Sequence, residues 1–223
     1  MAARPTVLVF DVNGTLSDLS PLADRLAAVG APPQLLSTWF AATLRDGIGL
    51  AAAGAFAPFD EVAAAVLTML LTEFVDGDPA RAAAEVLAEF SNVPLHADVP
   101  PALRSVHANG LRLATLTNGS RANAERLLER GGVADLMEQV LSVDAVRRWK
   151  PARDSYDYAV EACAAEPSAL MLVAAHPWDI DGASRAGWST CWVNRERLTY
   201  PAHLTAPDLV VSALTDLDEA LHL

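Results

Sequence analysis

The stretch VLVFDVNGTL, from Val7 to Leu16, constrains the fold of this chain more than any other. Four apolar residues lead without a break into Asp11 and a glycine-containing turn, which is typical of a buried strand in a parallel sheet. Open α/β sheets place their chemistry at the carboxyl ends of such strands. A carboxylate there loses hydration unless hydrogen-bond donors and a cation surround it. Asp11 is therefore a candidate nucleophile, and a turn or helix-capping aspartate is the alternative.

Length and charge narrow the class of protein. A chain of 223 residues can form one domain or a core with an insertion, and a net charge of −12 without a basic run disfavours nucleic-acid and membrane partners. The first apolar run is too short for a signal peptide, and the longest one, Val62 to Leu71, is too short to span a bilayer. Cys163 and Cys191 match no metal or redox spacing. We expect a cytoplasmic protein.

The chain changes character after Ser17. Residues 18–94 are rich in alanine and leucine at helical spacing, which predicts an inserted cap domain built as a four-helix bundle. From residue 95 onward, helical and strand patterns alternate, and one strand is expected over Val140 to Val146. We therefore predict an α/β fold, a doubly wound, Rossmann-like parallel sheet formed by residues 1–17 and 95–223. A helical cap over the strand ends would shield Asp11 from water.

Polar residues follow four predicted strands, and in a parallel doubly wound sheet these ends converge on one crevice. The residues are Asp11, Thr117 with Asn118, Lys150, and His176 with Asp179. The charge of Lys150 would balance Asp11 and keep it ionised. The convergence of these groups predicts an active site.

Each of these partners has a structural alternative. Lys150 can be a solvated lysine, and Thr117 with Asn118 can serve a turn and a helix cap. His176 can be a structural histidine, and Asp179 can be an acid in the first turn of a helix.

The same motifs carry a family resemblance. DVNGTL, LTNGS, Lys150-Pro151 and HPWDIDGA stand in the order and spacing of the haloacid dehalogenase superfamily. The longer stretches FDVNGTLSD, TLTNGS, LSVDAVRRWKPARDSY and AAHPWDIDGASRAGWSTCWVNR resemble the type II (L-2-haloacid) dehalogenases more closely. The resemblance covers the whole core, and the inserted helices fit the cap of that family.

The resemblance implies a role for each matching residue. Asp11 matches the nucleophile, Lys150 matches the motif lysine, and Asp179 matches an acid associated with water activation. Positions that orient the nucleophile or bind the substrate carboxylate or halide are matched by Thr15, Thr117 and Asn118. Tyr156 matches a tyrosine six residues after the lysine, with a core tyrosine as the alternative.

The chain also departs from the pattern of those dehalogenases. Asn13 replaces their usual tyrosine, His176 replaces an asparagine, and Ala174 replaces a serine. Their cap arginine, which handles the halide, follows a tryptophan, whereas here Phe40 follows Trp39. Arg45 on the same predicted helix is the candidate replacement, and the alternative is a solvated arginine. The predicted substrate-binding set comprises Asn13, Thr15, Phe40, Arg45, Thr117, Asn118, Tyr156 and Trp178.

Position 13 also separates two reactions. The phosphatases of the superfamily use a second aspartate there as general acid, together with a magnesium ion. Asn13 cannot transfer a proton, whereas a leaving halide needs none. We therefore predict a dehalogenase that needs no metal or other cofactor and acts on a small 2-haloacid through an ester on Asp11, giving a 2-hydroxy acid. The alternatives are a magnesium-dependent phosphatase or phosphonate-type hydrolase and a non-catalytic protein that binds a small carboxylate.

His176 is the departure with the clearest chemical meaning. Pro177 restricts its backbone to extended conformations, so the ring should face Asp11. We predict that His176 activates water against the ester, with Asp179 as an orienting partner. The alternative is a histidine that only hydrogen-bonds Lys150 or Asp11. The predicted partner is a halogenated carboxylate, and a homodimer is left open.

Overall fold

The computed structural model describes residues 5–223. Its helices and strands follow one another as β1 (Val7–Phe10), α1 (Pro21–Ala28), α2 (Leu35–Ala52), α3 (Phe59–Leu71), α4 (Pro79–Phe90), α5 (Val99–Ala108), β2 (Arg112–Thr117), α6 (Arg121–Arg130), β3 (Met137–Ser142), α7 (Arg153–Cys163), β4 (Leu170–Ala174), α8 (Pro177–Arg185), β5 (Ser189–Val193), β6 (Leu209–Val211) and α9 (Leu217–Ala220). Short 3₁₀ turns lie between some of them.

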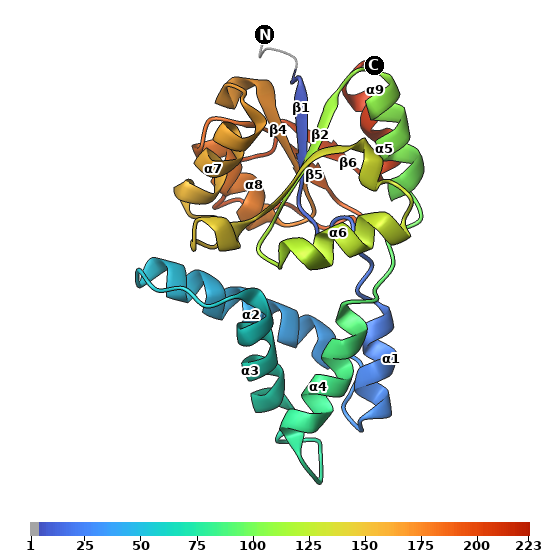
Figure 1. Cartoon of the computed structure of the whole chain (residues 1–223), viewed down its shortest axis with the longest axis vertical. Helices are drawn as coiled ribbons and strands as arrows, with labels where there is room; N and C mark the ends of the chain where they lie inside the picture. Colours follow the sequence, from blue (N-terminus) through green and yellow to red (C-terminus); the bar gives the residue numbers. More distant parts are fainter. Residues whose placement is uncertain (1–4) are drawn as a thin grey trace.

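The strands form one parallel sheet in the order β3-β2-β1-β4-β5-β6. β1 lies inside the sheet, and its alternating side chains enter two different clusters. Leu8 and Phe10 pack with α5 and α9, whereas Val7 and Val9 pack with α7 and α8, as the two sides of the sheet in Figure 1 show. Because both faces are covered, the whole strand is apolar up to Asp11. The predicted doubly wound α/β core is confirmed.

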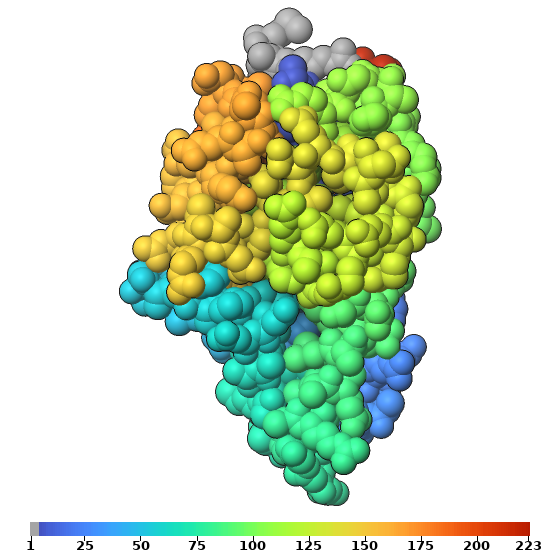
Figure 2. Space-filling model, in the orientation of Figure 1, coloured from blue at the N-terminus to red at the C-terminus, as the bar shows by residue number. Residues whose placement is uncertain are grey.

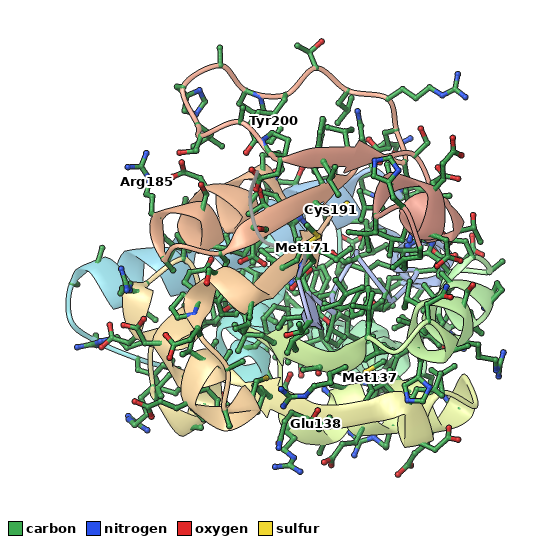
Figure 3. All side chains as sticks on the ribbon, turned by 90° about the horizontal axis from the view of Figure 1, so that it is seen from above. Met137, Glu138, Met171, Arg185, Cys191 and Tyr200 are labelled. Carbon is green, nitrogen blue, oxygen red and sulfur yellow. The ribbon has the colours of Figure 1, made fainter. Side chains whose placement is uncertain are left out.

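The view from above separates the interior of the sheet from its edge. In Figure 3, Met171 of β4 and Cys191 of β5 lie in the interior, whereas Glu138 of β3 lies at the edge. The prediction for this edge strand was wrong at both ends, because the strand is Met137–Ser142. Its first half is partly exposed and polar, which hides the strand pattern, and Ser142 accepts the Asp144 N–H to begin a 3₁₀ turn.

The four inserted helices share a hydrophobic cluster of their own. α2 packs on α3, α3 on α4 and α4 on α1, and the group lies on the side of the sheet toward which β1 leads (Figure 1). The chain enters and leaves this group at one place, where the Asp18 N–H donates to Pro94 O at 2.8 Å. The division at this crossing into a cap domain of residues 18–94 and a core remains a prediction.

Trp149 joins the helices to the core. It belongs to the loop that precedes α7, yet its ring packs in the cluster of the inserted helices and stacks on Phe59, with ring centroids 5.7 Å apart. Its indole N–H donates to Ala57 O at 2.9 Å. In Figure 2 the cyan atoms of the inserted helices abut the yellow and orange atoms of the core. The residue after Trp149 is Lys150, so this contact lies next to the candidate site.

None of the helices in residues 5–223 combines the length and the apolar character that crossing a membrane requires.

Candidate active site

Asp11 follows the last residue of β1 and is only 4% exposed. Its Oδ1 accepts a hydrogen bond from Lys150 Nζ at 2.9 Å, and its Oδ2 accepts one from the Thr15 hydroxyl at 2.7 Å. The same hydroxyl oxygen accepts the Ala175 N–H at 3.0 Å, which directs its hydrogen toward Asp11. The carboxylate is therefore held at both oxygens.

Lys150 is completely buried, and its ammonium group uses all three hydrogens. It donates to Asp11 at 2.9 Å, to Asp179 Oδ2 at 2.6 Å and to Leu116 O at 2.8 Å. Asn118 Oδ1 accepts the Lys150 backbone N–H at 2.8 Å. The end of β2 thus fixes the loop that brings the lysine to Asp11.

Asp179 lies behind the lysine and is also completely buried. Its Oδ1 accepts the hydroxyl of Tyr156 at 2.6 Å, while its Oδ2 accepts Lys150. Tyr156 comes from α7 and Asp179 from α8, so packing of these two helices builds the pair. Gly182 allows this approach, because a Cβ there would lie 2.4 Å from the Tyr156 hydroxyl.

The buried charges fix the ionisation of the group. Burial on its own would raise the pKa of Asp11, but the charges of Lys150 and His176 and the Thr15 hydrogen bond outweigh it and lower the pKa. Burial raises the pKa of Asp179, and the charge of Asp11 raises it further, against the opposing effect of Lys150. Burial would lower the pKa of Lys150, but the two carboxylates raise it. One lysine can balance the charge of only one carboxylate fully. Because the pKa of Asp11 is lowered and that of Asp179 is raised, Asp11 is the carboxylate that Lys150 balances.

His176 reaches the same carboxylate from the amino terminus of α8. Its Nε2 lies 2.8 Å from Asn13 O and 3.5 Å from Asp11 Oδ2. A carbonyl oxygen can only accept, so Nε2 carries a hydrogen. The ring stacks on Trp178, with ring centroids 5.5 Å apart. The centroid of the Phe40 ring, from α2, lies 5.7 Å from that of His176.

The comparisons with known proteins agree with this geometry. The family model described as a haloacid dehalogenase-like hydrolase matches residues 5–187. The chain belongs to the haloacid dehalogenase-like hydrolases. It is 27% identical over 218 residues to haloacetate dehalogenase H-2 of Moraxella sp. (strain B), covering 97% of this chain and 96% of that one. It is also 27% identical to the (S)-2-haloacid dehalogenase of Pseudomonas sp. (strain YL), covering 93% of this chain and 90% of the relative.

A solved structure extends the likeness to three dimensions. The L-2-haloacid dehalogenase of Xanthobacter autotrophicus with chloropropionic acid covalently bound superposes with a TM-score of 0.87 at 27% identity, covering 98% of both chains. The resemblance to the L-2-haloacid dehalogenases is thereby confirmed.

In this haloacid dehalogenase-like hydrolase, three residues predicted to bind substrate form hydrogen bonds with other parts of the protein. Thr117 Oγ1 accepts the Gly119 N–H at 2.9 Å, and Asn118 holds the backbone of Lys150. Tyr156 is completely buried behind Asp179. These side chains orient the lysine and its neighbours, and Thr117 also lines a small depression together with Asn13 and Gly119.

The structure also changes the expected hydrogen-bond partner of His176. The ring faces Asp11, as its position before Pro177 implies, but its predicted partner Asp179 is engaged by Lys150 and Tyr156. The nitrogen nearest Asp11 already bears a hydrogen and cannot accept one from water. This hydrogen is donated to Asn13 O, and the ring lies beside Asp11 with Nε2 3.5 Å from Oδ2, so the role of His176 in water activation stays a prediction.

The inserted helices contribute one predicted residue to this region. Phe40 and His176 line a cavity of about 520 Å³, whose wall also includes Leu36, Trp192 and Leu198. Arg45 lies elsewhere: its side chain is 67% exposed, pairs with Asp46 at 2.7 Å and lines a different depression, between α2 and α3. The structure does not bring Arg45 to Asp11, because it stands on another face of α2.

Sequence reasoning missed Arg195, which follows β5 and lines the same cavity. Its guanidinium pairs with Asp98 at 2.5 Å and donates to Thr15 O at 3.0 Å, so it supports the loop that carries Thr15. The rule that found the other residues, a polar group at the end of a core strand, applies to this fifth strand end as well.

Proposed function

We propose that this chain is a hydrolytic dehalogenase of small 2-haloacids that uses Asp11 as its nucleophile. The observation that supports this most directly is the ionised carboxylate of Asp11, which is almost completely buried and is held at both oxygens by Lys150 and Thr15. The names of the relatives from Moraxella and Pseudomonas, and the covalently bound chloropropionic acid of the Xanthobacter enzyme, point to the same reaction.

In the first step a carboxylate oxygen of Asp11 attacks C2 of the substrate. A C–O bond forms, the carbon–halogen bond breaks, and the halide leaves with its electron pair while C2 inverts. The fixed orientation aims the attacking lone pair, and exclusion of water preserves its reactivity. A halide needs no proton to leave, which agrees with the neutral Asn13.

In the second step water hydrolyses the ester. Lys150, 2.9 Å from Oδ1, stabilises the negative charge that develops on the aspartyl carbonyl oxygen. Water adds to Cγ, and the bond from Cγ to the ester oxygen, which Asp11 supplied, breaks. The departing alkoxide takes up one proton of the added water and leaves as the 2-hydroxy acid, and the second proton is released as Asp11 ionises again. Asp179 is completely buried behind Lys150 with both of its oxygens engaged, so we assign it the role of holding the lysine in place.

We further propose that residues 18–94 act as a cap in this reaction. The ring of Phe40 packs toward His176, and Trp149 fastens the helices beside Lys150. Both contacts keep water from the ester until the catalytic groups are in place.

The test compares Asp11→Asn with Asp46→Asn, which changes an exposed acid on α2. Both variants should fold, and only Asp11→Asn should lose halide release from short 2-haloacids. In heavy-oxygen water, a single turnover of the wild-type chain should place the label in Asp11, because water attacks Cγ. Near-normal turnover by Asp11→Asn, or label found in the first hydroxy acid released, would reject the mechanism.

A further inference from the structure

The imidazole of His176 lies beside two oxygen atoms that a metal ion would otherwise find attractive. Its Nε2 is 2.8 Å from the backbone oxygen of Asn13 and 3.5 Å from Asp11 Oδ2. A carboxylate and a carbonyl oxygen side by side are the ligands that hard divalent cations prefer. The ring presents a hydrogen to this pair of oxygens.

The ring is held in this position by its surroundings. Gly14 has a φ of +79°, which turns the loop around the imidazole, and a Cβ there would lie 3.4 Å from both Cε1 and Nε2 of His176. Trp178 stacks on the ring with an angle of 12° between the planes. The side chain of His176 is 18% exposed. These contacts make the histidine a fixed donor.

The residues around Asp11 do not fit the magnesium ion that the phosphatases of the superfamily use. Magnesium requires a near-octahedral set of open oxygen ligands. Here Lys150 donates to Oδ1 of Asp11 and Thr15 donates to Oδ2, which leaves one lone pair on each oxygen for a further ligand. Both carboxylate oxygens of Asp179 accept hydrogens as well. In the described part of the chain, no three His, Cys, Asp or Glu side chains are grouped so that they could hold a metal ion.

We propose that the N–H of His176 occupies the place of a divalent cation and excludes one from this site. It is donated to the Asn13 carbonyl oxygen beside the Asp11 carboxylate, so the ring stands where a cation would have to contact both oxygens. His176 is therefore a positioning residue that makes the site independent of metal. A single substitution that replaces the donor by an acid should create a cation site from the oxygens of Asp11, Asn13 and the new carboxylate.

The experiment measures Mn²⁺ binding to the full-length chain by calorimetry and by electron paramagnetic resonance. The variants are His176→Asp, His176→Asn and His107→Asp, the last of which adds the same charge on the exposed face of α5. His176→Asp should bind Mn²⁺ at least tenfold more tightly than the wild type. His176→Asn keeps an N–H donor and should resemble the wild type. Adding Asp11→Asn to His176→Asp should abolish the gain.

Equal Mn²⁺ binding by His176→Asp and His107→Asp would overturn the proposal, and so would Asp11-dependent Mn²⁺ binding by the wild type. If circular dichroism shows that His176→Asp does not fold, His176→Ala takes its place. That variant frees the same two oxygens and should bind Mn²⁺ more tightly than His176→Asn, and failure to do so would again reject the proposal. The proposal deepens the proposed function, but cation binding is measured without a haloacid, so its failure and a failure of dehalogenation are distinguishable.

Discussion

The α/β core and the four inserted helices bury different kinds of side chain. The core buries Asp11, Lys150 and Asp179 as one connected group of charges. Within the described helices of the insertion, the buried side chains are apolar apart from Thr43, and the charged groups lie toward solvent. Buried charges are costly unless they are paired, so their concentration at the strand ends marks where the chemistry is. The helices provide cover and shape.

The first prediction tests this difference by removing Lys150, the cation at the centre of the buried charged group. Lys150→Met leaves Asp11 and Asp179 buried without their shared cation. Such losses typically cost about 3–5 kcal/mol of stability. Halide release should fall by at least about two to three powers of ten, since the carbonyl oxygen loses its donor. Denaturant unfolding and a halide assay measure the two effects. Arg153→Met, which breaks an exposed ion pair with Asp157, is the control and should change neither quantity noticeably.

The second prediction tests how the two regions are joined. Gly47 of α2 faces Trp149, and a Cβ at this position would lie 2.3 Å from the indole ring, whereas a Cβ on Gly49 would meet nothing within 4 Å. Gly47→Ala should therefore cost about 1–3 kcal/mol through overpacking and lower turnover by moving the loop of Lys150. Gly49→Ala should stabilise the chain by about 0.5–1 kcal/mol. Unfolding and halide-release measurements on both variants decide it, and equal behaviour would mean that Trp149 does not couple the regions.

The third prediction compares one buried threonine from each region. Thr15 donates to Asp11 and accepts from Ala175, whereas the hydroxyl of Thr43 has no hydrogen-bond partner among residues 5–223. Thr15→Val should lose about 1–3 kcal/mol of stability, because the Ala175 N–H is left unpaired. It should also slow ester formation, because Asp11 loses the hydrogen bond that orients its Oδ2. Thr43→Val should be neutral or stabilising. Thermal unfolding of both variants is the measurement, and a Thr43→Val variant less stable than Thr15→Val would contradict this account.

How far the sequence determined the site differs between the same two regions. Parallel topology alone brings Asp11, Lys150 and His176 together, because strand ends converge whatever their side chains are. The topology does not specify hydrogen-bond partners. Asn118 turns to the backbone of Lys150, and Asp179 turns to Tyr156, because rotamers and packing of α7 on α8 decide these contacts. These hydrogen-bond partners therefore could not be predicted from the pattern of residue types in the sequence.

For the inserted helices, the sequence predicted the elements but not their rotation. Phe40 and Arg45 were both expected at the substrate, yet five residues on an α-helix turn by about 140° relative to each other. Only one of them can face His176 beside Asp11, and the packing of Trp39 against Ala63 selects Phe40. Alanine-rich helices offer several similar apolar faces, so the spacing of residues alone could not make this choice.

The smallest expected effect comes from testing that rotation directly. Arg45→Ala removes an exposed cation that pairs only with Asp46 among the described residues, and kcat/KM should stay within about twofold of wild type. Phe40→Ala removes a ring that packs toward His176 from the same helix and should lower kcat/KM measurably. Steady-state halide release from 2-chloropropionate compares the matched pair. A large loss in Arg45→Ala with none in Phe40→Ala would mean that α2 turns its other face to the substrate during the reaction.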